Sequence, residues 1–134
     1  MTTSVIALVL GVVVAITAAV IWVRVERPIA FPGRSVMSLD QLYNLFYGDN
    51  TVSPGAVREA FDLIGRIFGV PPGMLRPSDR FDGELRIAQG WSHYDSSIDA
   101  ITDELRVACR GKTVDFSKVH TVDDVVRLIS RYDE

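Results

Sequence analysis

The chain has 134 residues, which is enough for one small domain with appendages, and a formal net charge of −3. Residues 49–134 hold 11 Lys or Arg and 15 Asp or Glu, a net charge of −4, and this argues against a nucleic-acid-binding protein, which needs a basic face. The only cysteine, Cys109, excludes an internal disulfide and is typical of a reducing compartment.

The first predicted element is an uncharged apolar run from Val5 to Val23. Its 19 residues would span about 28 Å as a helix, close to the hydrocarbon thickness of a bilayer. A cleaved signal peptide is the alternative, but it would have a basic segment before the run and small residues at its end. Here the run follows MTTS and ends in Ile-Trp-Val. The sequence therefore predicts a retained single transmembrane helix within residues 1–23.

The charges that flank this run predict its orientation. Arg24, Arg27 and Arg34 follow it against a single acid, Glu26, and no Lys or Arg precedes it. The positive-inside rule then places the carboxyl-terminal part in the cytoplasm. We expect a single-pass protein of a bacterial-type inner membrane.

Residues 24–52 are predicted to be a linker with one short helix. The segment RPIAFPGR, residues 27–34, contains two prolines and a glycine and is typical of irregular structure. Ser38 and Gln41 then form a capping-box pattern at the start of a helix that ends near Gly48. Its apolar face could dock a partner or lie on lipid, but packing on the bundle is the favoured interpretation. That face consists of Leu39, Leu42, Tyr43 and Phe46.

The second helix is predicted from Ser53-Pro54, an N-cap followed by a proline at the first helical position, to Gly69. A long loop follows over residues 70–85, with three prolines and two glycines. We expect apolar side chains of this loop and of the segment after it to point inward. They are Leu75, Phe81, Leu85 and Trp91.

Two more helices complete a predicted all-α bundle over residues 53–134. One runs from about Ser96 to Arg110, and the last is capped by Thr121 with Asp124 at its third position. Val122, Val125, Val126 and Ile129 are expected to form the buried side of the last helix. The predicted core residues are Phe61, Ile64, Leu105 and Val126.

Three segments of this bundle resemble the acyl carrier protein family. VREAFDLIGRIFGV is similar to the first helix of the family, PPGMLRPSDRFDGEL to its first loop, and HTVDDVVRLIS to its last helix. The resemblance covers residues 53–130 and implies a small acyl-carrier-like helical bundle, here behind a membrane anchor.

In that family an Asp-Ser-Leu motif opens the second helix, and its serine carries 4′-phosphopantetheine. The corresponding residues here are Asp95, Ser96 and Ser97. The resemblance therefore implies Ser96 as the attachment residue, with Asp95 beside it. An anionic phosphodiester suits the positive end of a helix. A shift of one residue, which would restore an apolar stripe in the helix, would place Asp95 at the modified position instead.

Two interpretations of Ser96 lead to two functions. As the site of 4′-phosphopantetheine, it makes the chain a membrane-tethered carrier that presents a thioester-bound acyl or aminoacyl group to membrane-associated enzymes, after modification by a phosphopantetheinyl transferase. As a plain N-cap, in a capping box with Asp99, it fits a carrier-shaped adaptor that docks a partner protein at the membrane. Ser97 is the less favoured acceptor.

Catalytic and metal sites are not predicted. His93, Asp95 and Ser96 are neighbours in sequence, whereas the members of a hydrolase triad usually come from distant segments, and no Gly-x-Ser-x-Gly elbow is present. His93 and His120 are too isolated to make a metal site of three or four ligands. Cys109 is expected to be a small buried or half-buried residue. The sequence thus predicts a protein without enzymatic activity of its own.

Overall fold

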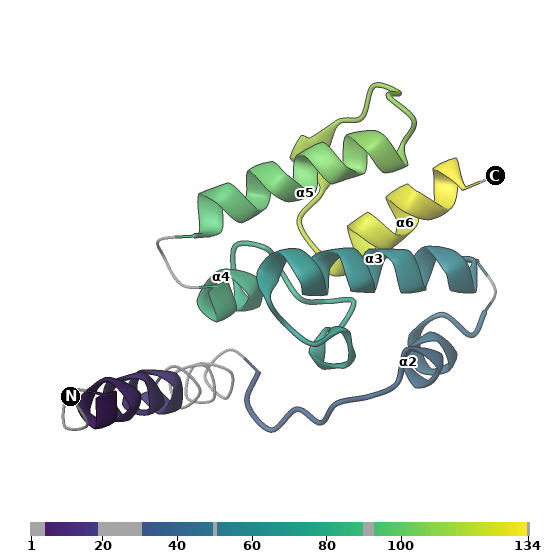
Figure 1. Cartoon of the computed structure of the whole chain (residues 1–134). Helices are drawn as coiled ribbons and strands as arrows, with labels where there is room; N and C mark the ends of the chain where they lie inside the picture. The colour runs from purple at the N-terminus through teal and green to yellow at the C-terminus, as the bar shows by residue number, and fades with distance from the viewer. Residues whose placement is uncertain (1–4, 19–30, 50, 90–92, 134) are drawn as a thin grey trace.

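The computed structural model describes residues 5–18, 31–49, 51–89 and 93–133, and in them the regular structure is helical apart from one isolated bridge between Arg80 and Thr121. The predicted all-α class is confirmed for this part of the chain (Figure 1). A helix over residues 5–18 precedes the bundle. The elements of the bundle are α2 (Leu39–Phe46), α3 (Pro54–Phe68), η1 (Pro72–Met74), α4 (Glu84–Gln89), α5 (Tyr94–Ala108), η2 (Phe116–Lys118) and α6 (Val122–Tyr132).

The helix over residues 5–18 has only exposed side chains in the structure. In the portion of the chain that the structure describes, no helix is both long enough and apolar enough to span a bilayer. The predicted anchor continues to Val23, and residues 19–30, which include Arg24 and Arg27, lie outside the described residues.

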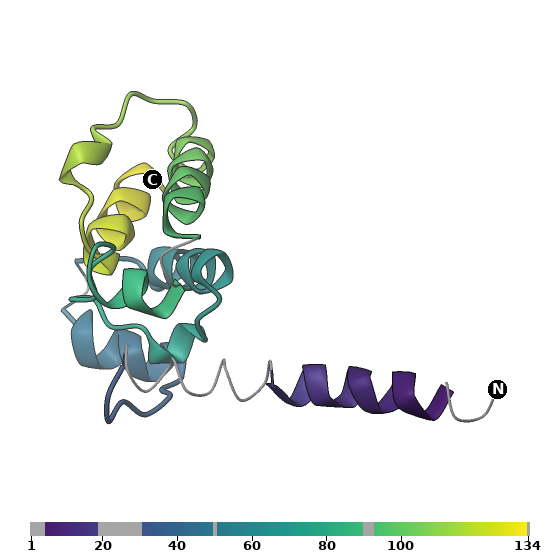
Figure 2. The ribbon, with the colours of Figure 1, turned by 90° about the vertical axis from the view of Figure 1, so that its left-hand side faces the viewer.

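Helix α3 is the central element of the bundle. Its ends are those predicted: Ser53 Oγ accepts a hydrogen bond from the backbone N–H of Ala56 at 3.1 Å, and Gly69 closes the helix in the left-handed region, at φ 66°. Two views at right angles show α5 and α6 on one side of α3 and α2 on the other (Figures 1 and 2). Because it has neighbours on both sides, α3 is buried over much of its circumference.

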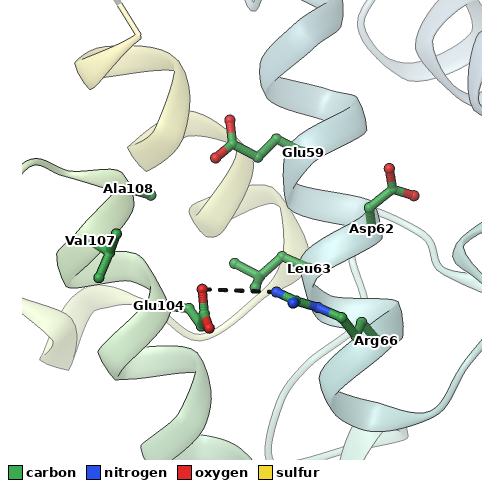
Figure 3. A pocket seen from close by; sticks show the side chains of 7 residues that line it. All are labelled: Glu59, Asp62, Leu63, Arg66, Glu104, Val107 and Ala108. Atoms are coloured by element: carbon green, nitrogen blue, oxygen red, sulfur yellow. Dashed lines mark ion pairs between the residues drawn. The ribbon is translucent and has the colours of Figure 1, made fainter.

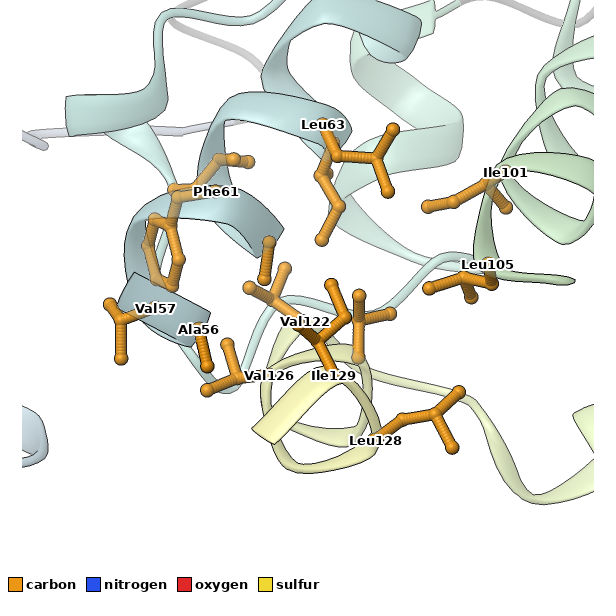
Figure 4. Close-up of a cluster of buried hydrophobic side chains, with 14 of the residues drawn as sticks. Ala56, Val57, Phe61, Leu63, Ile101, Leu105, Val122, Val126, Leu128 and Ile129 are labelled. Atoms are coloured by element: carbon orange, nitrogen blue, oxygen red, sulfur yellow. The ribbon is translucent and has the colours of Figure 1, made fainter. Parts of the chain in front are cut away.

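The core lies between α3, α5 and α6 (Figure 4). The four predicted core residues are confirmed, since Phe61, Ile64, Leu105 and Val126 are each at most 1% exposed. The capping box of α6 is confirmed too, because Thr121 Oγ1 accepts from Asp124 N–H while the Asp124 carboxylate accepts from Thr121 N–H. The buried side of α6 includes the expected Val122, Val125, Val126 and Ile129.

Helix α2 packs on the bundle, as the favoured interpretation expected. Its predicted capping box, Ser38 with Gln41, is present, and Leu42 is fully buried. At the end of α2, Tyr47 donates a hydrogen bond to Asp123 of α6 at 2.8 Å. Phe31, Leu42 and Tyr47 belong to the same hydrophobic cluster as the α3 core. The predicted linker therefore supplies part of the core from Phe31 onward.

The segment before α2 is held against the long loop. Met37 N–H donates to Gly73 O at 3.0 Å, and Arg76 Nη2 donates to Ser35 O at 2.8 Å. At Gly73 the two backbones are so close that a Cβ would collide with the Met37 carbonyl, so glycine is required there. The loop and the incoming chain thus form one packed unit.

A buried ion pair joins the same two segments. Asp79 is 1% exposed, and Arg34 Nη1 lies 2.7 and 2.9 Å from its two carboxylate oxygens. The backbone N–H of Arg76 donates to the same carboxylate at 2.7 Å. Burial, and then the nearby charge of Arg34, lower the pKa of Arg76. The Asp79 carboxylate therefore has two partners, the Arg34 guanidinium and the backbone N–H of Arg76.

The long loop is only partly as predicted. Leu75, Phe81 and Leu85 are buried, which confirms their inward orientation, while Trp91 lies outside the described residues. The loop also contains η1 and leads directly into α4, and neither helix was predicted. A six-residue helix is too short to give a periodic pattern of apolar residues.

Candidate functional site

The candidate attachment site lies at the start of α5, and the structure corrects where this helix begins. It starts at Tyr94, with His93 as N-cap, and the side chain of His93 makes no capping hydrogen bond. The first bond of the helix runs from Ser97 N–H to His93 O at 3.0 Å. The prediction that Ser96 is the N-cap, in a capping box with Asp99, is therefore wrong.

Side-chain contacts from α4 reach the first residue of α5. Tyr94 is half-buried, and the guanidinium of Arg86 in α4 lies 5.2 Å from the centroid of its ring. Burial, and then the charge of Asp82, raise the pKa of Tyr94. Tyr94 is thus already helical two residues before Ser96, with its ring against Arg86 of α4.

The two serines at the start of α5 have opposite environments. Ser96 is the third residue of α5 and is exposed, and within the described residues its hydroxyl makes no hydrogen bond. Ser97 is 6% exposed and belongs to the buried side of the helix. An enzyme that modifies a hydroxyl on this turn can reach Ser96 without unfolding the helix, whereas Ser97 is covered.

The electrostatics of this turn are mixed. Ser96 lies in the first turn of a 15-residue helix, where the helix dipole favours a negative group. Asp95 and Asp99 are exposed beside it and add negative charge. A phosphodiester would therefore gain from the dipole and lose from the two carboxylates, with solvent screening both effects. An arm attached through the Ser96 hydroxyl fits sterically.

A cavity of about 190 Å³ lies along α5, from Tyr94 to Leu105. Tyr94 and Ile98 of α5 contribute to its wall, and the opposite wall comes from the long loop and from η2. Ser96 is not among the lining residues, and it points to another side of the helix than Tyr94, which is two positions before it. The lining residues outside α5 are Phe81, Asp82, Phe116, Val119 and His120.

The other candidate residues are placed as follows. His93 and His120 are both exposed, and no hydrogen bond joins the side chains of His93, Asp95 and Ser96 in the described structure. Over those same ranges, no group of three or more His, Cys, Asp or Glu is arranged to hold a metal ion.

Cys109 is fully buried, as expected, and burial raises the pKa of its thiol, so that it is not an activated nucleophile.

Comparison with known proteins gives no relative for this chain: no family model, no curated protein and no solved structure matches it. The resemblance to acyl carrier proteins consequently stays a prediction from three sequence segments. Those segments fall on α3, on the long loop with η1, and on α6.

Proposed function

We propose that this protein is a membrane-tethered, acyl-carrier-like protein whose Ser96 carries 4′-phosphopantetheine. The observation that supports this most is the contrast on the first turn of α5: the Ser96 hydroxyl is exposed and makes no hydrogen bond to the described residues, whereas Ser97 is buried. The arm, once attached, supplies a thiol that carries an acyl or aminoacyl group as a thioester. The protein supplies the position of the arm and the surface that partners recognise.

The residues of this chain have distinct roles in the proposal. Ser96 provides the oxygen that becomes esterified to the phosphate, and Asp95 lies beside it on the exposed face. The first turn of α5 orients the attachment point away from the core because the neighbouring Ser97 faces inward. Asp95 and Asp99 give this end of the helix a negative potential, which suits a basic surface on a transferase or an acyl-handling enzyme.

The cavity beside α5 offers a place for a short acyl group. Its volume of about 190 Å³ is comparable to an apolar cavity of about 150 Å³ that binds benzene. Tyr94, Ile98 and Phe81 are among its lining residues. A cavity of this volume suits a short apolar acyl group better than a long acyl chain.

The tether is proposed from the amino-terminal run. The described helix over residues 5–18 exposes large apolar side chains, among them Leu8 at 68% and Val14 at 63%. Such a surface is stable in lipid but costly in water. With the arginines that follow the run, this supports a single-pass protein of an inner membrane, with the bundle in the cytoplasm.

A second candidate function is an adaptor without a prosthetic group, which docks a partner protein at the membrane. It is favoured by a groove of about 370 Å³ between α3 and α5, which is larger than the cavity along α5 and is lined by other residues. In this case Ser96 is an ordinary exposed helical serine.

The intact mass of the protein distinguishes the two functions. The full chain is expressed with a phosphopantetheinyl transferase of broad specificity and supplied with coenzyme A. The carrier function requires a gain of about 340 Da, the mass of the arm. The gain should disappear in Ser96→Ala and persist in the matched control Ser97→Ala. No gain, under conditions that modify a known carrier protein, would leave the adaptor.

A further inference from the structure

A second surface lies in the groove between α3 and α5 (Figure 3). This α3–α5 groove has a volume of about 370 Å³. Leu63 and Arg66 point from α3 toward Glu104 on α5, so the two helices are separated here by side chains that do not fill the space (Figure 3). The residues of the groove used below are Glu59, Asp62, Leu63, Arg66, Glu104 and Val107.

The groove exposes apolar surface. Val107 is 76% exposed, which is the largest exposure among the large apolar side chains of the described bundle. Leu63, at 7% exposed, reaches the same hollow from α3. A hollow with an apolar floor and an unpartnered valine at its edge suits an apolar side chain from another molecule.

The rim of the groove is negative. Glu59 and Asp62 are exposed on α3, and neither has an ion-pair partner in the described residues. Arg66 is the one basic residue of the lining, and its contact with Glu104 is long, 3.8 Å, with both side chains at least half exposed. An exposed pair of this kind is held weakly and opens at little cost. With three acids against one base, the groove complements a cationic partner.

We propose that the α3–α5 groove binds an amphipathic helix of a partner protein, with an apolar residue against Leu63 and Val107 and with Lys or Arg against Glu59 and Asp62. A helix laid in a groove uses side chains spaced three and four residues apart in this way. Glu104 and Val107 are eight and eleven residues after Ser96 in α5, about 12 and 16 Å along its axis. The groove is thus separate from the candidate attachment site, and both can be occupied together.

The test uses the full chain in nanodiscs of zwitterionic lipid. The probe is a fluorescent 18-residue amphipathic helix of Lys and Leu, and binding is read from anisotropy after subtraction of the signal with empty nanodiscs. The double variant Glu59→Lys with Asp62→Lys should weaken binding at least about tenfold, because two attractions become repulsions. Val107→Ser, which removes the apolar contact without changing the charge, should also weaken it. The same probe with Glu in place of Lys should not bind.

The matched control is Asp40→Lys with Asp133→Lys, which makes the same change of net charge on exposed residues outside the groove. This control should change the affinity less than about threefold. Equal weakening by both double variants would overturn the proposal, and so would the absence of binding above that of empty nanodiscs. Ser96→Ala should bind the probe normally, so the groove can be tested whether or not the arm exists.

Discussion

Arg34 is joined to Asp79 across 45 residues of sequence by an ion pair in which one Arg34 nitrogen contacts both carboxylate oxygens. Asp79 is almost completely buried, whereas the Arg34 side chain keeps 21% of its surface exposed. The pair fastens the segment that enters from the amino-terminal run onto the long loop. Arg34 therefore has a structural role in addition to any part in membrane orientation.

We expect Arg34→Ala to lower the free energy of unfolding by about 2–4 kcal/mol, because it leaves the buried carboxylate of Asp79 without its cation. Arg58→Ala is the matched control: Arg58 pairs with Asp40, but these side chains are 63% and 84% exposed. Its loss should cost less than about 1 kcal/mol. Urea unfolding followed by circular dichroism measures both, and equal costs would contradict the role given to Asp79.

The same contacts define where the folding unit begins. A fragment from residue 35 onward keeps α2 to α6, but it lacks both Arg34 and the buried Phe31. A fragment from residue 28 onward keeps them. We expect the longer fragment to unfold cooperatively and the shorter one to melt at least about 10 °C lower. Identical melting temperatures would show that residues 28–34 are dispensable.

The core assignment has its own test at Phe61. This side chain of α3 is fully buried in the hydrophobic cluster (Figure 4), and Phe61→Ala should cost about 3–5 kcal/mol. For a small domain this is a large part of the total stability. Ile87→Ala in α4 is the control, since Ile87 is 52% exposed, and it should change stability by less than about 1 kcal/mol. A Phe61→Ala protein that unfolds like the wild type would refute the packing of α3.

Structural features that depend on neighbouring residues were predicted well from the sequence. The capping boxes at Ser38 and Thr121, and the proline and glycine that bound α3, depend on residues a few positions apart. Their side chains bond to the nearest backbone whatever the rest of the fold does. The buried positions of α3 and α6 followed for a similar reason, because an apolar period of three and four residues leaves one face to bury.

Features that depend on distant residues were missed. Nothing near Asp79 indicates that its partner is Arg34, and nothing near Ser96 indicates that Tyr94 would already be helical, with Arg86 of α4 against its ring. The groove was missed too, although Glu59 and Asp62 are three residues apart on the polar side of α3 and could have indicated an acidic face. In each case the sequence does not show which distant segments pack against one another.

The hydroxyl of Tyr47 should make the free energy of unfolding depend on pH. Burial, and then its hydrogen bond to Asp123, raise the pKa of Tyr47 far above its ordinary value of about 10. Only the unfolded state releases the proton, so this contribution is complete below about pH 10 and declines as the pH rises further.

Tyr47→Phe should cost about 1 kcal/mol at pH 7, through loss of the hydrogen bond to Asp123. The difference between the variant and the wild type should shrink between pH 10 and pH 11, because only the wild type loses the contribution of this hydroxyl. Chemical denaturation at both pH values measures the difference. Parallel losses in the two proteins would mean that Tyr47 titrates normally in the folded state.

Substitution of Ser96 tests the start of α5 and the attachment of the arm separately. A serine at the N-cap would cost about 1 kcal/mol on replacement by alanine. In the structure Ser96 is instead the third residue of α5, where alanine is the better helix former, so Ser96→Ala should change stability by no more than about 0.5 kcal/mol and in the stabilising direction. The same substitution should abolish loading of the arm.

Melting curves and loading assays on Ser96→Ala are therefore expected to give opposite results: an intact fold and no cargo. Ser97→Ala is the control for register, because its hydroxyl is buried and should be dispensable for loading. A clear loss of stability in Ser96→Ala would mean that α5 begins at Ser96 after all. Loading that survives in Ser96→Ala and disappears in Ser97→Ala would place the attachment one residue later, on a serine that must then leave the core to react.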